Sequence, residues 1–128
     1  MRLEVIVEEL APGFVAIRAL GRISSHDAAA FEQRVREVLA TRPQGIIFNF
    51  TGLSAIVSLG ITVLFACQRY HDHDFKMAIV GAHGSVLQSL RLIGLLDSIQ
   101  IADSEKEALV LLRELSKRLP KIDPSELE

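Results

Sequence analysis

Cysteine and aromatic residues are scarce in this chain of 128 residues. Tryptophan is absent, aromatic residues make up 5% of the chain, and Cys67 is the single cysteine. One cysteine excludes an internal disulfide and a zinc site built on several cysteines, which favours a reducing, cytoplasmic compartment. Because 49% of the residues are hydrophobic and so few are aromatic, the core has to be built from leucine, isoleucine, valine and alanine.

An excess of basic residues is also missing. The chain has 14 lysines and arginines against 16 aspartates and glutamates, and its net charge of −2 arises in residues 121–128, where one lysine meets three acids. Duplex binding depends on positive charge facing the phosphates, so nucleic acid is excluded as a partner. The length fits one domain, which we place at residues 1–119, followed by a tail over residues 120–128.

The chain has no long uninterrupted apolar run. Its first residues alternate apolar and acidic side chains, unlike a signal peptide. The charge-free window over residues 43–68 spans 26 residues and is long enough to cross a bilayer. Polar residues such as Asn49, Thr51 and Ser54 interrupt it, and a strand, a loop and a buried helix in succession give the same hydropathy. We therefore expect no direct membrane insertion.

Hydrophobic periodicity divides the chain into alternating strands and helices. Short apolar or alternating runs predict strands over residues 3–8, 14–20, 45–50, 75–81 and 98–101. Apolar residues at helical spacing predict helices that begin near Ser24, Ser58, Val86 and Ser104. The first and last of these starts have a serine followed three residues later by an acid, as in a capping box. Since strands joined through helices need crossover connections, the order predicts one α/β domain with a mixed, mostly parallel sheet.

Sequence signatures of enzymes are missing. The chain has no Walker A loop, dinucleotide fingerprint, nucleophile elbow or His-Glu-x-x-His motif. Histidine and aspartate alternate over residues 71–74, but neighbours at a helix end point to different sides, which favours a solvated helix end over a metal site. The turn over residues 81–85 offers amides to a phosphate, although its two glycines are typical of an ordinary turn. We expect no enzymatic activity, no metal and no cofactor, and a buried, unreactive Cys67.

One segment, residues 51–61, is unusual enough to carry function. Here a buried strand leads through a loop to Ser58 at the start of a helix, and partners gather at this carboxyl end of parallel strands. The Ser58 hydroxyl is expected either to cap the helix, which stabilises it by about 1 kcal/mol, or to carry a phosphate held by the helix N-terminus. The residues alone leave both interpretations open.

Five segments in this order resemble the STAS domain family, the module of anti-sigma-factor antagonists and of sulfate-transporter tails. The resemblance runs from Phe14 to Leu112 and rests on Leu20–Ile23, Ile46–Leu53, Val57–Gly60, Leu90–Leu95 and Ser104–Leu109. It implies a single-domain α/β fold with a four- to five-stranded mixed sheet and about four helices mainly on one face. Ser58 matches the family's phospho-acceptor, whereas Val57 and Asn49 stand where the family carries acids, and Leu59 replaces a second hydroxyl.

The resemblance also implies a partner and a role. In bacterial antagonists of this family an ATP-dependent anti-sigma kinase phosphorylates the serine, and the unphosphorylated form binds the kinase and frees the sigma factor. We therefore expect a non-enzymatic interaction module that binds an anti-sigma factor. The partner-binding residues implied are Ser54, Ile56, Val57, Ser58, Leu59, Gly60 and Ile61. Two alternatives are a cytoplasmic accessory subunit docked on the ATPase of a lipid-trafficking ABC transporter and a stress-signalling scaffold. A second copy of the chain is a further candidate partner.

Overall fold

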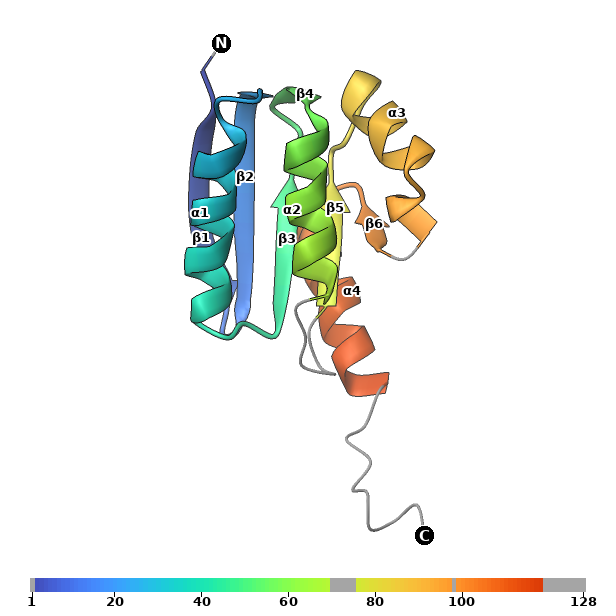
Figure 1. Ribbon diagram of the computed structural model, residues 1–128. Coiled ribbons are helices and arrows are strands. Elements are labelled where there is room, and N and C mark those ends of the chain that lie inside the picture. The colour runs from blue at the N-terminus through green and yellow to red at the C-terminus, as the bar shows by residue number, and fades with distance from the viewer. Residues whose placement is uncertain (1, 70–75, 98, 119–128) are drawn as a thin grey trace, which may run out of the picture.

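Strands and helices alternate along the chain in the computed structural model (Figure 1), which describes residues 2–69, 76–97 and 99–118. The strands are β1 (Glu4–Ala11), β2 (Phe14–Ile23), β3 (Gly45–Asn49), β4 (Leu53–Ile56), β5 (Lys76–Val80) and β6 (Gln100–Ala102). The helices are α1 (Ala28–Ala40), α2 (Ser58–Arg69), α3 (Gly84–Leu92), the 3-10 helix η1 (Leu95–Asp97) and α4 (Glu105–Arg118). The histidine-aspartate run at 71–74 and the expected tail at 120–128 lie outside the described residues.

The strands form a mixed sheet in the order β1-β2-β3-β5-β6. β1 pairs with β2 antiparallel, whereas β2, β3, β5 and β6 pair in parallel with one another in that order. This arrangement confirms the predicted α/β class with a mostly parallel sheet. Figure 1 shows the N-terminal ends of α1, α2 and α3 at the same end of the sheet, which is the carboxyl end of its parallel strands.

The structure adds a strand to the four or five that were expected. β4 occupies part of the segment predicted as a loop and pairs in parallel with the end of β2, where Ile56 lies opposite Ile23. β2 accordingly continues to Ile23 rather than ending at Leu20. Four residues are too few for a periodic signal, and the partner strand lies far earlier in the chain, so local periodicity does not reveal this pairing.

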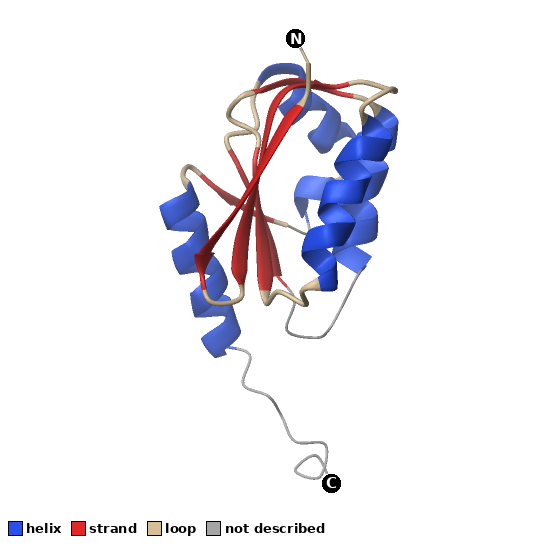
Figure 2. Cartoon of the chain, turned by 90° about the vertical axis from the view of Figure 1, so that its left-hand side faces the viewer, coloured by secondary structure: helices blue, strands red, loops and turns tan. Residues whose placement is uncertain are grey.

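Helices cover the two faces of the sheet unequally. Figure 2 shows a single helix on one side of the strands and the remaining helices on the other. The single helix is α4, which packs on β3, β5 and β6, while α1 contacts α2 on the opposite face. The larger core lies under α1, α2 and α3 and includes Phe31, Phe48 and Phe50, and the smaller core under α4 includes Ala108 and Leu112. The expected placement of helices mainly on one face is confirmed.

The two predicted capping boxes differ in the structure. At α4 the Ser104 hydroxyl accepts a hydrogen bond from the Glu107 N–H at 3.1 Å, as predicted. At α1 the Ser24 hydroxyl instead donates to the Asp27 carboxylate at 2.7 Å, and the helix begins only at Ala28. The prediction of a cap by the Ser24 hydroxyl is therefore wrong, because the nearby carboxylate competes with the backbone N–H groups for that hydroxyl.

The charge-free residues 43–68 fold as β3, β4 and most of α2. Apart from the added strand, this is the predicted succession of strand, loop and buried helix. Across the described ranges, no helix combines the length and apolar character that crossing a membrane requires.

Candidate functional site

Ser58 is the first residue of α2 and is held in place by the strand before it. β4 ends two residues earlier, and the Val57 N–H donates to the Ile23 carbonyl at 3.0 Å, which extends the β2–β4 pairing to the helix start. The loop after β3 therefore delivers Ser58 to the carboxyl end of the sheet, as predicted, but through a paired strand rather than a free loop.

The Ser58 hydroxyl does not cap α2. The Val57 carbonyl accepts the N–H of Gly60 at 2.9 Å and of Ile61 at 3.2 Å, so Val57 occupies the N-cap position. Ser58 is exposed, and among the described residues its hydroxyl has no hydrogen-bond partner. The capping interpretation is therefore wrong, and the hydroxyl remains accessible to another molecule.

The first turn of α2 has no acidic residue. The positive end of the helix dipole is thus not neutralised by a side chain of its own turn, and an anion placed there is stabilised by about 0.3–1 kcal/mol. The leading N–H groups of a helix also lack partners within the helix. This end of α2 is electrostatically suited to a phosphate on Ser58.

The predicted partner-binding residues fall into two groups. Ser54, Ser58 and Leu59 are exposed and Val57 is half-buried; these four residues form what we call the Ser58 surface. Leu59 contributes its main apolar area, with 58% of its surface accessible. The Ser54 hydroxyl itself is engaged in the fold, donating to the Gly21 carbonyl at 2.9 Å.

The other three predicted residues, Ile56, Gly60 and Ile61, are buried. Both isoleucines belong to the main core, and a Cβ at position 60 would stand 2.8 Å from the Cγ1 atom of Ile56. None of the three presents an exposed side chain in this conformation, and their part in partner binding stays a prediction. They hold the start of α2 against β2 and β4, and so support the Ser58 surface from beneath.

The turn between β5 and α3 braces the residues that precede Ser58. Gly81 has a left-handed φ of +73°, and a Cβ there would overlap Thr51. The His83 Nε2 atom lies 3.0 Å from the Thr51 carbonyl oxygen, and the Ser85 hydroxyl donates to the Ser54 carbonyl at 3.0 Å. Gly81 and the polar side chains of this turn therefore position the segment that leads to Ser58.

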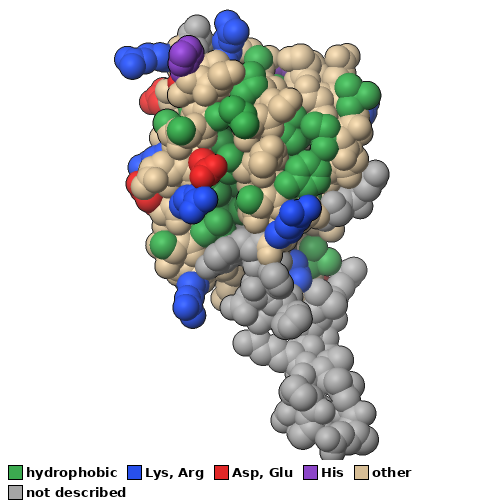
Figure 3. Space-filling view, viewed as in Figure 1, with side chains coloured by type: hydrophobic (Ala, Val, Ile, Leu, Met, Phe, Trp, Pro, Cys, Tyr) green, Lys and Arg blue, Asp and Glu red, His purple; other side chains and the backbone are tan. Residues whose placement is uncertain are grey.

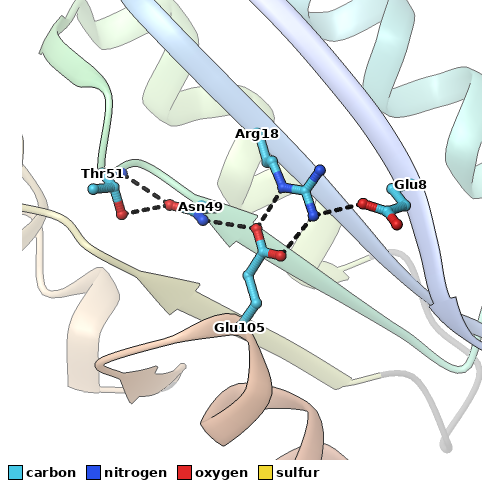
Figure 4. Close-up of polar contacts among 5 residues, drawn as sticks. All are labelled: Glu8, Arg18, Asn49, Thr51 and Glu105. Atoms are coloured by element: carbon cyan, nitrogen blue, oxygen red, sulfur yellow. Dashed lines mark hydrogen bonds and ion pairs between the residues drawn. The ribbon is translucent and has the colours of Figure 1, made fainter.

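A network of polar side chains lies on the α4 side of the sheet (Figure 4) and was not predicted. Arg18 donates two hydrogen bonds to the Glu105 carboxylate, each at 2.7 Å, and forms an ion pair with Glu8 at 2.7 Å. Asn49 donates to Glu105 at 2.7 Å, and its side-chain oxygen accepts the Thr51 N–H at 3.0 Å and hydroxyl at 2.6 Å. The network joins β1, β2, the end of β3 and the start of α4.

The network gives a physical reason for asparagine at position 49. Its amide donates to Glu105, whereas a carboxylate there would face a second carboxylate. Hydrogen bonds from Arg18, and then from Asn49, hold the pKa of Glu105 below its usual range. The pKa of Arg18 is raised in turn, first by Glu105 and then by Glu8. Glu105 lies 87 residues from Arg18 and 56 from Asn49, so no local pattern marks these residues as partners.

Within the described residues, Cys67 gives no sign of a reactive thiol. Cys67 is 1% exposed, and burial raises the pKa of its thiol to about 12, which keeps it protonated at neutral pH; the prediction of a buried thiol is confirmed. Over the part of the chain that is described, no three or more histidine, cysteine, aspartate or glutamate side chains gather in a way that could hold a metal ion.

A mixed sheet with helices mainly on one face and an accessible serine at the start of a helix define a class of single-domain α/β protein. The chain belongs to the STAS domain family: a sequence model of that family matches residues 6–108. The resemblance identified from the sequence motifs is thereby confirmed, and the match includes the Ser58 surface and the whole polar network.

Named relatives agree with this assignment. The chain is 26% identical over 102 residues to the anti-sigma-F factor antagonist RsfB of Mycobacterium tuberculosis, covering 79% of this chain and 83% of that protein. Its fold is similar to the crystal structure of an anti-sigma factor antagonist from Mycobacterium paratuberculosis, with a TM-score of 0.81, 20% identity and coverage of 88% and 95% of the two chains. Unphosphorylated SpoIIAA, an anti-sigma factor antagonist, has a TM-score of 0.75 at 20% identity, covering 87% of this chain and 97% of its own.

Proposed function

We propose that this protein is a non-enzymatic interaction module that acts as an anti-sigma-factor antagonist in a bacterial partner-switching system. Its unphosphorylated form binds an anti-sigma factor through the Ser58 surface, and phosphorylation of Ser58 releases that partner. The observation that carries the proposal is the exposed Ser58 hydroxyl, which has no hydrogen-bond partner within the described part of the chain, beside the exposed Leu59. Membership of the STAS family and the named role of the RsfB relative support the choice of partner.

A phosphate on Ser58 has opposite effects on this chain and on its partner. It adds roughly −1.5 to −2 charges, which the acid-free first turn of α2 accommodates within the protein itself. The same charge lies next to Leu59, whose side chain has to be desolvated when an apolar partner surface docks. Burying an anion in that interface is unfavourable unless the partner supplies a cation, so the phosphorylated form dissociates.

Paired substitutions at Ser58 test the switch. The partner is first isolated by affinity capture of the tagged protein from its own host and identified by mass spectrometry, and affinities are then measured by titration calorimetry. Ser58→Asp should weaken binding about 100-fold, equivalent to about 2.7 kcal/mol, whereas Ser58→Ala should bind within a few-fold of wild type. Ser25→Asp, at another exposed serine, controls for added charge alone. Equal affinities of the aspartate and alanine variants at position 58 would contradict the switch.

A substitution at Leu59 tests the docking surface independently of phosphorylation. Leu59→Glu should abolish complex formation and leave the melting temperature nearly unchanged, because the residue is exposed. Leu92→Glu is the matched control, since Leu92 is 88% exposed at the far end of α3. Binding retained by Leu59→Glu would remove the Ser58 surface from the proposal.

The apolar side chains at Val57 and Leu59 favour a second candidate function, an accessory STAS subunit that docks on the ATPase of a lipid-trafficking ABC transporter. Such a subunit, or a stress-signalling scaffold, needs the apolar surface without the phosphoswitch. Capture of transporter ATPase subunits, together with unimpaired binding by Ser58→Asp, would replace the first proposal with this one.

A further inference from the structure

A groove between α1 and α2 lies apart from the Ser58 surface. It has a volume of about 390 Å³, with Val35, Leu39 and Ala40 of α1 on one wall and Val63, Ala66 and Cys67 of α2 on the other. Small-molecule sites occupy about 300–1,000 Å³ and occur between packed helices. Figure 3 views this side of the molecule and shows hydrophobic side chains in several separate patches, with charged side chains between and around them.

Small residues create the groove. Packed helices normally fill the space between them to the density of an organic crystal. Here Ala40, Thr62 and Ala66 occupy positions on the two walls, and none of them reaches across to the facing helix as a leucine or phenylalanine would. The small residues of the two helices thus leave the space open, and the longer side chains of Glu32, Arg36 and Leu39 also line it.

The chemistry of the lining selects an uncharged apolar occupant. Val35, Val63 and Cys67 form the floor and are 1%, 5% and 1% exposed, and the buried thiol carries no charge. The two charged residues on the lining, Glu32 and Arg36, form an ion pair with each other at 3.0 Å. Their opposite charges offset each other, so the rim offers little net attraction to an ion.

We propose that the α1–α2 groove binds a small, uncharged, apolar or aromatic molecule. The groove also touches the start of α2, because Thr62 lines it and the Thr62 hydroxyl donates to the Ser58 carbonyl at 3.0 Å. An occupant that shifts Thr62 therefore acts on the turn that presents Ser58. Binding stands independently of the function proposed above; its use as an input to partner binding rests on that function.

Two fluorescent probes that differ in charge test the binding. N-phenyl-1-naphthylamine is uncharged, and 8-anilino-1-naphthalenesulfonate has the same rings with a sulfonate. The uncharged probe should bind the full chain saturably, with one site, and more tightly than the sulfonate. Ala66→Leu, which fills the groove, should weaken binding about tenfold or more, equivalent to about 1.4 kcal/mol, while Ala30→Leu, at an exposed alanine of α1 outside the lining, should not.

The result that overturns the site is equally plain. Either absence of saturable binding to wild type or unchanged binding by Ala66→Leu would remove it. If Ala66→Leu fails to fold by circular dichroism, Ala40→Leu on the facing wall replaces it with the same expectation. A sulfonate that binds as tightly as the uncharged probe would overturn the assigned ligand class.

The link to Ser58 is tested by amide chemical shifts, without any partner protein. The uncharged probe should move the Ser58 amide signal in wild type and should move it much less in Thr62→Val, which keeps the side-chain shape but lacks the hydroxyl. A Ser58 signal that is unmoved while the Ala66 signal shifts would overturn the link. Because no partner takes part, failure of this test is distinguishable from failure of the proposed partner switch.

Discussion

The side chain at position 49 decides whether the Glu105 carboxylate in the polar network faces a hydrogen-bond donor or a second carboxylate. Asn49 lies 2.7 Å from the Glu105 carboxylate through its amide nitrogen, and its oxygen holds Thr51. Asn49→Asp restores the type of residue that the STAS resemblance implies for this position but places like charges in contact. We expect the variant to be less stable than wild type by about 1–3 kcal/mol at pH 7, measured by urea unfolding.

The pH dependence separates charge repulsion from the loss of a donor. With two facing carboxylates, the pKa of one rises above its unfolded value of about 4, so its proton stays bound at higher pH in the folded state. The extra instability of Asn49→Asp relative to Asn49→Ala should thus be absent below about pH 4 and grow as the pH rises towards 7. A constant difference between the two variants across this range would show that repulsion is not its cause.

Glu105 makes the wild-type protein sensitive to acid. Its pKa is lowered in the folded state, mainly by the hydrogen bonds from Arg18, so its charged form contributes stability above the unfolded pKa of about 4.3, and that contribution is lost as the pH falls through the lower folded value. Glu105→Gln should reduce stability at pH 7 and flatten the fall in stability below pH 5. Glu107→Gln, on the exposed side of the same helix, should keep the wild-type slope, as measured by unfolding at several pH values.

Individual residues differ in how far the sequence predicts them. Burial of Cys67 follows from its place on an apolar helix. Accessibility of Ser58 does not follow from the sequence, because periodicity does not fix the geometry of the loop that leads to it. The pairing of Arg18 with Glu105 does not follow from the sequence, because the two residues are 87 positions apart and β2 and α4 come together only in the folded sheet. The sequence also does not predict the burial of Ile61, since an apolar residue at a helix start is equally consistent with a docking residue and with a core residue.

At the scale of elements, the sequence predicts strands and helices that have a periodic pattern of their own. The helix from Ser58 and the strands over 45–50 and 75–81 match α2, β3 and β5 closely. The sequence does not predict β4, because residues 53–56 have no periodic pattern of their own. They form a strand by pairing with the extension of β2. That pairing also sets the position of the Ser58 surface. The sequence motif therefore predicts where the candidate site lies along the chain, but not which of its side chains are exposed.

The turn between β5 and α3 contacts the turn between β3 and β4, and this contact holds α3 against β4. A substitution at Gly81 tests it. A Cβ at position 81 would come within 2.9 Å of the Thr51 backbone and closer still to its hydroxyl, whereas one at Gly84 would meet nothing within 4 Å. Both glycines have a positive φ, so alanine is strained at either position by about 1–2 kcal/mol. Gly81→Ala should destabilise by about 1–3 kcal/mol more than Gly84→Ala in thermal or urea unfolding. Equal effects would mean that the turns separate freely.

At the scale of the whole molecule, the two proposed binding regions share one face and one helix. α2 presents the Ser58 surface at its start and one wall of the groove along its length, while α4 and the polar network occupy the other face of the sheet. The network is linked to the Ser58 surface through Thr51 and the β3–β4 connection. A ligand in the groove and a substitution in the network therefore act on Ser58 from opposite sides of the sheet.

The two edges of the sheet differ in their capacity to pair with another chain. β1 carries Glu4, Glu8 and Glu9, and acidic residues on an edge strand oppose pairing with a second copy. β6 has no charged residue over Gln100–Ala102, its outer edge is unpaired within the sheet, and Ile101 is 48% exposed. We expect a second copy of the chain to associate weakly through β6, in sedimentation experiments over a range of concentrations.

Matched substitutions on the two edges distinguish them. Ile101→Lys places a charge on β6 and should leave the chain monomeric at concentrations where wild type associates, because a lysine on an edge strand disfavours pairing. Ile6→Lys makes the same change on β1, where Ile6 is 40% exposed, and should leave the association unchanged. A wild type that is monomeric throughout, or a dimer lost only with Ile6→Lys, would exclude β6 as the contact. Since Ile101 is not part of the Ser58 surface, Ile101→Lys should also bind the partner as wild type does, which separates self-association from partner docking.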